Sequence, residues 1–479
     1  MDSIDTAIDK LEQKIAKLKP LYKKTREVLG LDKRSLALFR ITMACVVLYD
    51  LWDRSYELHA HYSDAGLMPR TKALEFFWNF YWLSVHMMTG NENWQAIIFL
   101  IHAIFAILML IGYRTRLFTF LTWFMVISLQ SRNFIVGHGG DQVLRLYLFW
   151  SIFLPIGECF SIDAIINDNN NTNITEYEYG RKRKKNHHDN IAFNGASVAL
   201  LCQIAFLYIF SFFHKTGTEW NVDLTASYYA LQLDYFRTPV ADIFLMFPGL
   251  LKLLTYSVLR WEGYGPLLFF SPFKTHWCKT FAVFGFVVLH MSFQACLRLA
   301  IFGWVCAAGA TCALPSWVWD SLILPRLRTP KRLGFKLLYN PKSLHSLKAV
   351  QIIRMFFLMH ETEIVPLYPL QKYSTRTENY YHESDQDAEN ASPDEGSYAP
   401  SFDTTHAYES SSLIVKNHQG AVVQDYDAVM AILEMSPTLF PLYYLMKVPL
   451  MNRVGSMAYA VTVGSCSVVS EFLWDKEAP

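Results

Sequence analysis

Charged side chains are scarce in this chain. Only 18% of its 479 residues are Asp, Glu, Lys or Arg, while 52% are hydrophobic and 15% are aromatic. This composition is too apolar for a typical soluble protein of this length, and it predicts a membrane protein with a soluble appendage. The formal net charge of +1 gives no basic surface for nucleic acid, so no nucleic-acid partner is expected.

Several motifs that indicate a particular chemistry are missing. The chain has no C-x-x-C pair, no glycine-rich phosphate loop, and neither the H-E-x-x-H nor the G-x-S-x-G motif. Its eight cysteines lie mostly in apolar segments, which favours small buried side chains over disulfides or a zinc site. His59 and His61 form too short and isolated a pair to indicate a metal, so we expect no metal site.

Long apolar runs recur along the first two thirds of the chain. About eight of them are long enough, or nearly so, to cross a bilayer as helices. They cover roughly residues 35–52, 94–113, 117–136, 141–157, 192–213, 249–271, 278–296 and 299–315. Before them, residues 1–30 carry apolar positions at spacings of three and four among many charges. This pattern predicts an amphipathic helix that lies on the membrane or pairs with a partner.

The basic residues predict the orientation of these spans. If the N-terminus lies in the cytosol, most basic clusters of the chain fall on the cytosolic side, as the positive-inside rule requires. These clusters are the basic residues of 19–34, Arg114 and Arg116, the RKRKK run at 181–185, Lys274 and Lys279, and the residues of 326–336. We therefore expect a multi-pass integral protein of the endoplasmic reticulum, another endomembrane or the plasma membrane, in contact with membrane lipid.

A polar, glycine-broken loop runs directly into an apolar helix between residues 131 and 160. Asp141 and Arg145 in this stretch are four residues apart, so they share one helical face and can pair. Ionisable residues in membrane segments usually face a cavity or serve a function. The topology brings several such residues to the outer face, which predicts a small-molecule site between helices. Its substrate-binding candidates are Arg132, Asn133, His138, Asp141, Arg145 and Trp220. The alternative is that they are ordinary capping and interface residues.

Several runs between residues 30 and 320 share their order and spacing with a known family. They are DKRSLALFRI (32–41), LYDLWDR (48–54), HYSDAGLMPR (61–70), GYRTRL (112–117), SRNFIVGHGGDQVLRLYLFWSIFLPIG (131–157), HKTGTEW (214–220) and LHMSFQACLRLAIFGW (289–304). On these runs the segment 31–325 resembles the HTTM family, the membrane domain shared by vitamin K-dependent gamma-carboxylase and many bacterial proteins.

The resemblance implies two catalytic residues. In the carboxylase, a lysine shortly before a tryptophan deprotonates vitamin K hydroquinone, and here Lys215 precedes Trp220 with TGTE between them. His290 matches a histidine in the corresponding carboxylase helix. A lysine acts as a base only where burial or a nearby cation favours its neutral amine. From the residues alone, Lys215 can equally be a lysine that snorkels to the interface and His290 a structural donor.

Two features depart from the carboxylase pattern. Glu158 stands where the carboxylase has a functional histidine, just before the run FSID (160–163) that corresponds to its W-S-V-D. The sequence also shows no counterpart of the long lumenal region through which carboxylases hold their protein substrate. Both departures favour a different reaction or a non-enzymatic role.

After Pro330 the sequence alternates short strands and helices. LGFKLLYN (333–340) and TEIVPLYPL (362–370) are expected strands on either side of a helix, and 412–437 is an expected hairpin and helix with Gly420 at the turn. The insert 373–411 is rich in Ser, Asp, Glu and Tyr, and we expect it to be disordered. On this pattern the segment 331–479 resembles the DCC-type thiol-disulfide oxidoreductases, which have a thioredoxin-like fold and often follow HTTM domains.

The redox motif of that family, Asp-Gly-Asp-Cys-x-x-Cys, is altered here. The corresponding residues run from Asn340 to Ser346, and both cysteine positions hold serine, at Ser343 and Ser346. Disulfide exchange needs a thiolate nucleophile and a second sulfur, and serine supplies neither. We therefore expect a degenerate cytosolic domain that packs against the protein or binds a protein partner.

These observations predict a mainly α fold, in which a polytopic helical membrane bundle of about eight spans precedes a small α/β thioredoxin-like domain. Two functions stay open. In the first, the membrane domain binds vitamin K hydroquinone or another quinone-like apolar molecule. Lys215 and His290 then act in an epoxidase or gamma-glutamyl carboxylase-like lyase reaction. In the second, the protein is a non-enzymatic scaffold or lipid-binding protein with a redox-inactive partner-binding module.

Overall fold

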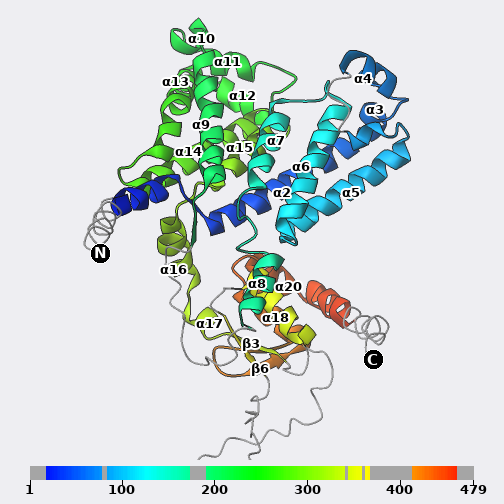
Figure 1. The fold of residues 1–479 in the computed structure, drawn as a ribbon, viewed down its shortest axis with the longest axis vertical. Helices are drawn as coiled ribbons and strands as arrows, with labels where there is room; N and C mark the ends of the chain where they lie inside the picture. The colour runs from blue at the N-terminus through cyan, green and yellow to red at the C-terminus, as the bar shows by residue number, and fades with distance from the viewer. Residues whose placement is uncertain are drawn as a thin grey trace, which may run out of the picture. The chain divides into compact units, whose positions relative to one another are not determined.

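The chain folds into two compact units, Met1–Pro325 and Arg326–Pro479. The computed structural model describes residues 18–77, 84–172, 190–339, 344–358, 362–366 and 413–460 (Figure 1). Residues 18–29 of the predicted N-terminal amphipathic helix are helical, while residues 1–17 and the predicted insert 373–411 lie outside the described residues.

Helices make up most of the described part of the first unit (Figure 1). The longer ones are α2 (Lys33–Ser55), α5 (Glu92–Ile111), α6 (Thr115–Arg132), α7 (Gly139–Ser151), α8 (Ile162–Thr172), α9 (Gly195–His214), α13 (Pro248–Tyr264), α14 (Thr275–Cys296) and α15 (Phe302–Thr311). Shorter pieces connect them: β1 (Leu31–Asp32), α3 (Leu58–Tyr62), α4 (Arg70–Phe77), η2 (Val85–Met87), β2 (Ile191–Ala192), α10 (Thr218–Asn221), α11 (Ala226–Leu231), α12 (Pro239–Leu245), η4 (Gly265–Phe270), η5 (Val318–Ile323) and α16 (Leu324–Leu327).

All eight predicted apolar segments contain a helix, but fewer of these helices are built to cross a membrane alone. Among the described residues, four are long and apolar enough, namely α2, α5, α9 and α14. A fifth span results if α12 and the continuous stretch Pro248–Phe270 count as one. Helix α7 has 13 residues, about 20 Å, against a hydrocarbon core of about 30 Å. The count of eight is therefore not confirmed, because α7 and α15 are short and α6 ends in polar residues.

The candidate fifth span is sharply bent. Helix α12 and the stretch Pro248–Phe270 meet at 106° across a short break. Pro248 opens α13, where its missing N–H costs nothing at the helix start but prevents α12 from continuing. The bend places α13 beside α9 and carries Glu262 into the interior of the unit.

Three long helices start at the same end of the bundle. Strands β1 and β2 pair Leu31 with Ala192, which brings the starts of α2 and α9 together. Lys279, near the start of α14, donates a hydrogen bond from Nζ to the Gly30 carbonyl at 3.1 Å. Arg54, Lys215 and the last turns of α14 belong to the other ends of these three helices.

The second unit combines a four-stranded sheet with helices. Its elements are α17 (Pro330–Leu333), β3 (Lys336–Tyr339), α18 (Leu344–Phe357), β4 (Glu363–Pro366), β5 (Ile414–Lys416), β6 (Val422–Gln424), α19 (Asp425–Met435), α20 (Phe440–Met446) and a helix at 449–460. The strand order is β4-β3-β5-β6, with β3 parallel to β4 and antiparallel to β5, and β5 antiparallel to β6. A core of residues from the sheet, α18 and α19, including Leu337, Val350, Val415 and Ile432, holds the unit together.

Gly112 shows how the loop after α5 depends on a residue without a Cβ. It ends α5 with φ +70°, and an added Cβ would lie 2.3 Å from Ser161 Cβ. We expect Gly112→Ala to lower unfolding stability by at least about 1 kcal/mol, the cost of a left-handed L-residue. The matched control is Gly195→Ala at the start of α9, where an added Cβ meets nothing within 4 Å. Thermal melting of the purified protein compares the two, and equal midpoints would contradict this account.

Candidate functional site

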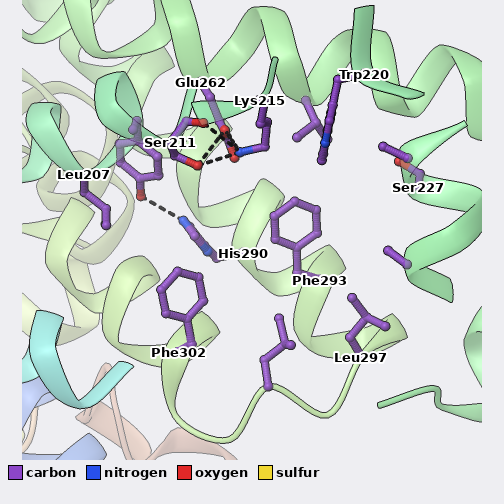
Figure 2. A pocket seen from close by; sticks show the side chains of 15 residues that line it. Leu207, Ser211, Lys215, Trp220, Ser227, Glu262, His290, Phe293, Leu297 and Phe302 are labelled. Carbon is purple, nitrogen blue, oxygen red and sulfur yellow. Dashed lines mark hydrogen bonds and ion pairs between the residues drawn. The ribbon is translucent and has the colours of Figure 1, made fainter. Parts of the chain in front are cut away.

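A pocket opens between α9, α11, α13 and α14 of the first unit (Figure 2). Its volume is about 270 Å³, close to the lower limit of small-molecule sites. The lining is mostly aliphatic and aromatic, with a few polar side chains. The lining residues are Leu207, Tyr208, Ser211, Lys215, Trp220, Ala226, Ser227, Ala230, Val258, Glu262, His290, Phe293, Leu297, Leu299 and Phe302.

Lys215 enters the pocket from the C-terminal end of α9. It is the C-cap residue of that helix, and its backbone N–H bonds to the Phe212 carbonyl. Because Tyr208, Ser211 and Lys215 are spaced by three and four residues, they share the face of α9 that turns to the pocket. Lys215 Nζ donates to Ser211 Oγ at 2.5 Å and forms an ion pair with Glu262 Oε2.

Glu262 supplies the opposite charge from α13. The side chains of Lys215 and Glu262 are only 16% and 7% exposed, so water screens the pair poorly. Ser211 Oγ also donates to Glu262 Oε2 at 3.1 Å, which ties the three groups into one cluster (Figure 2). Taking two charges out of water costs several kcal/mol per ion. An ionisable pair retained in such an environment is a candidate functional site.

Trp220 forms an aromatic wall beside the ion pair. Residues 216–221 fold back so that α10 brings the indole ring over Lys215, with Nζ 5.0 Å from the ring centroid. Asn221 holds this turn by donating from its side-chain amide to the Lys215 carbonyl at 2.8 Å. The flat ring and the ammonium group thus meet the same volume of the pocket (Figure 2).

His290 lies on the α14 side of the pocket. Its Nε2 is 2.8 Å from the hydroxyl of Tyr208, whose ring stacks on Phe286 at 3.9 Å. His290 Nδ1 is buried and has no hydrogen-bond partner among the described residues. Phe293 and Phe302 flank the imidazole ring, at 6.0 and 5.7 Å between ring centroids. The ring is therefore held in one orientation by aromatic contacts and a single hydrogen bond.

The remaining predicted residues lie elsewhere, so the single shared site predicted from the sequence divides in two. Asp141 does not pair with Arg145, although their spacing allows it. Its carboxylate instead binds Arg54 Nη2 of α2 at 2.7 Å, and Arg54 also binds Asp50 at 2.9 Å. Arg145 itself is partly exposed on α7 and does not line the pocket.

Arg132 and Asn133 have structural roles in the chain that follows α3. Arg132 is fully buried and donates to the carbonyls of Met68 at 2.8 Å and Tyr62 at 2.9 Å. The Asn133 amide donates to the His61 carbonyl at 2.9 Å. Both side chains thus satisfy backbone groups of residues 61–68, as the alternative reading of capping and interface residues expected.

His138 caps α7 and completes a second polar group. Its Nδ1 accepts from the Gly140 N–H at 3.1 Å, while Asp141 Oδ2 accepts from the His138 N–H. Burial lowers the pKa of His138, which favours the neutral ring that this cap needs. One potential ligand atom each of Asp50, His138 and Asp141 lie within 4.8 Å of one another, as a metal site requires. The Arg54 guanidinium already binds both carboxylates, so a cation is in place without a metal.

Phe302 connects the pocket around Lys215 with the polar group around Asp141. Phe302 lines the pocket, and its Cα would lie 2.9 Å from a Cβ added to Gly140, which directly precedes Asp141. A bulkier residue in place of Gly140 would therefore push against the pocket wall. The Asp141 group supports the pocket from behind, while Lys215, Trp220 and His290 line it.

Glu262, Ser211 and Tyr208 were not predicted as site residues. A signal for Glu262 was present, because a carboxylate interrupting the apolar run 249–271 is costly unless it is paired. The sequence could not name its partner, since Lys215 lies 47 positions earlier and the bend before α13 brings them together. Ser211 and Tyr208 carried no signal beyond their helical spacing from Lys215.

Compared with family models, curated proteins and solved structures, the chain matches none of them.

Proposed function

We propose that this protein is an integral membrane protein that binds a small, flat, quinone-like molecule in the pocket beside Lys215. The observation that carries the proposal is the ion pair of Lys215 and Glu262 at the wall of an otherwise apolar pocket. Ligand sites commonly combine apolar walls with a few convergent polar groups. Quinones have this character, since two carbonyl oxygens stand on a flat apolar ring.

The residues present fit such a ring. A pocket of about 270 Å³ is larger than the 150 Å³ or so that holds benzene, and it leaves room for a substituted ring. Trp220, Phe293 and Phe302 offer aromatic faces for stacking. The Lys215 ammonium offers a donor to one ring oxygen. An apolar tail would leave along the aliphatic lining, for instance Leu207 and Leu297.

The polar groups provide a route for a proton. A ring hydroxyl placed at Lys215 Nζ can pass its proton into the Lys215–Ser211–Glu262 cluster, whose members are already joined by hydrogen bonds. Lys215 can take the role that the resemblance to the HTTM domain of the carboxylase implies once its own proton has passed to the Glu262 carboxylate, because only the neutral amine accepts a proton. A quinone, when bound, supplies the redox chemistry, and the chain itself orients the ring and holds the proton. The hydrogen bond between His290 and Tyr208 fixes the α14 wall of the pocket.

The second unit supports a role without redox activity of its own. Its strand order and directions are those expected of a thioredoxin-like βαβ-ββα arrangement, in line with the resemblance to DCC proteins. Ser346 lies in the first turn of α18, where that family has its second cysteine, and Ser343 lies outside the described residues. We propose that this unit binds a protein partner.

The alternative function is a non-enzymatic lipid-binding or scaffold protein. The structural feature that favours it is the completeness of the Lys215 contacts, since its ammonium already has Glu262, Ser211 and Trp220 as partners. These contacts of Lys215 hold α9 against α13 without any ligand.

Binding of a quinone to the pocket can be measured directly. Titrating menadione into the protein in nanodiscs should quench tryptophan fluorescence, since Trp220 lines the pocket. Ala230→Trp fills the pocket and should weaken binding by at least about tenfold, or 1.4 kcal/mol. Ile104→Trp is the matched control, because residue 104 is an exposed position on α5 away from the pocket, and its affinity should be unchanged. Equal affinity in all three proteins would reject this site.

Turnover separates the enzyme from the scaffold. If Lys215 receives a proton during a reaction, aerobic consumption of menadiol by the protein should fall to background in Lys215→Ala. General-base catalysis typically contributes about 10²–10⁴-fold. Retained quinone binding together with consumption no faster than that of Lys215→Ala would leave the lipid-binding or scaffold alternative.

A further inference from the structure

The C-terminal part of the second unit exposes an apolar surface. Over α20 and the helix 449–460, large hydrophobic side chains lie open to the surroundings, with Leu450 and Met457 each 69% exposed. The other exposed members are Phe440, Leu442, Tyr444, Leu445, Val448 and Val454. We call this set the C-terminal apolar surface. Soluble surfaces seldom gather this many large apolar groups unless they contact a partner or a membrane.

The exposed residues follow a helical pattern. Leu450, Val454 and Met457 are spaced by four and three residues, so they form one stripe along the helix 449–460. The neighbouring face turns toward the unit, where Tyr459 packs near Tyr426 at 6.2 Å between ring centroids. The helix thus has one side held by its own unit and one apolar side with nothing described against it.

The charged residues within the segment that carries this surface have a single sign. Between Ser436 and Ala460 the chain carries Lys447 and Arg453 and no acidic residue. Lys447 Nζ lies 4.8 Å from the ring centroid of Tyr443. Arg453 directly precedes Val454, a residue of the stripe. Aromatic rings, apolar side chains and basic groups on one amphipathic segment are the composition of interfacial membrane helices.

We propose that the C-terminal apolar surface lies on a lipid bilayer, with its apolar stripe in the headgroup region and Lys447 and Arg453 against anionic headgroups. The occupant is a bilayer rather than a protein because the same chain carries helices able to span one. A membrane surface is then always within reach of the second unit. Tethering raises the effective concentration of that surface, so a short amphipathic segment with modest intrinsic affinity is enough. Both charged residues of the segment 436–460 are basic, which matches anionic lipid.

The experiment measures the depth of single positions in the full-length protein. A nitroxide is attached through a genetically encoded keto amino acid at Leu450, and in a matched protein at Val422, which is 53% exposed on β6. Each is placed in nanodiscs with or without anionic lipid. We expect the Leu450 label to be more accessible to oxygen than to a nickel chelate, as in a bilayer. The Val422 label should show the reverse.

The charge requirement gives a second, independent readout. Replacing both basic residues, in Lys447→Ala/Arg453→Ala, or omitting anionic lipid should move the Leu450 label toward water. A Leu450 label as accessible to nickel as the Val422 label would overturn the proposal. The proposal would also be overturned if insertion of the Leu450 label did not depend on lipid charge, or if the label stayed immobilised in detergent. Immobilisation that grows with protein concentration would identify a second copy of the chain as the occupant.

Discussion

Replacing Glu262 by leucine should destabilise the first unit by about 3 kcal/mol and weaken menadione binding strongly. The substitution leaves the Lys215 ammonium in a mostly apolar pocket, with Ser211 as its remaining hydrogen-bond acceptor among the side chains described. Breaking a buried pair on one side costs about 3–5 kcal/mol, since the other charge stays without compensation. The lower end applies here because Lys215 keeps 16% of its side chain exposed. Apparent melting in detergent, with and without menadione, measures both effects.

The double variant Lys215→Met/Glu262→Leu is the decisive control. It removes both charges at similar volume, and such replacements of buried pairs are often neutral or stabilising. It should therefore melt closer to the parent protein than Glu262→Leu does, yet it should not restore menadione binding. If the double variant is as unstable as the single one, the loss comes from packing and not from the unpaired ammonium. If it binds menadione normally, the ion pair takes no part in recognition.

Replacing Arg54 by methionine should have the second large effect. Asp50 and Asp141 would face each other in the interior with no cation, although each lies within 3 Å of the guanidinium in the parent protein. Arg54 Nη1 also donates to the Tyr62 hydroxyl at 3.0 Å, so α2, α3 and α7 lose a common tie. We expect a loss of at least about 3 kcal/mol in unfolding stability.

The control for this variant is an arginine in a comparable but more exposed pair. Arg70 binds Asp64 with side chains 32% and 39% exposed, and exposed pairs contribute about 0–1 kcal/mol. The pairing with Arg70 also lowers the pKa of Asp64, so that carboxylate stays charged at neutral pH. Arg70→Met should therefore lower the melting midpoint only slightly. Adding Asp141→Asn to Arg54→Met should recover part of the stability. No difference between Arg54→Met and Arg70→Met would contradict the role assigned to the buried network.

The helical character of the chain followed from its hydropathy, whereas the number of spans did not. Each apolar run predicted a helix because a long apolar segment in a membrane must satisfy its backbone hydrogen bonds internally, and each run contains a helix. Whether a run crosses a bilayer depends on where the helix starts and ends. Helix α7 begins only at Gly139, after the His138 cap, and stops at Ser151. Those ends are set by capping and turn contacts that hydropathy does not record.

The candidate site shows the same division between local pattern and long-range contact. Lys215 and Trp220 are five positions apart, so a turn after α9 can bring them together, and the sequence alone indicated both. The Asp141–Arg145 pair was equally local but did not form. Arg54, more than eighty positions earlier, offered a better-placed and buried partner. Local spacing shows which residues are able to meet, and competition from distant residues decides which do.

The sequence by itself determined that this is a helical membrane protein, because apolar content and charge distribution are properties of composition. It also determined that serine stands at positions 343 and 346, where the DCC proteins that the second unit resembles have cysteine. Only the tertiary structure decided that Glu262 neutralises Lys215, that Asp141 belongs to Arg54, and that one pocket gathers Lys215, Trp220 and His290. Contacts between residues tens of positions apart depend on helix ends, bends and crossing, which no single stretch of sequence encodes.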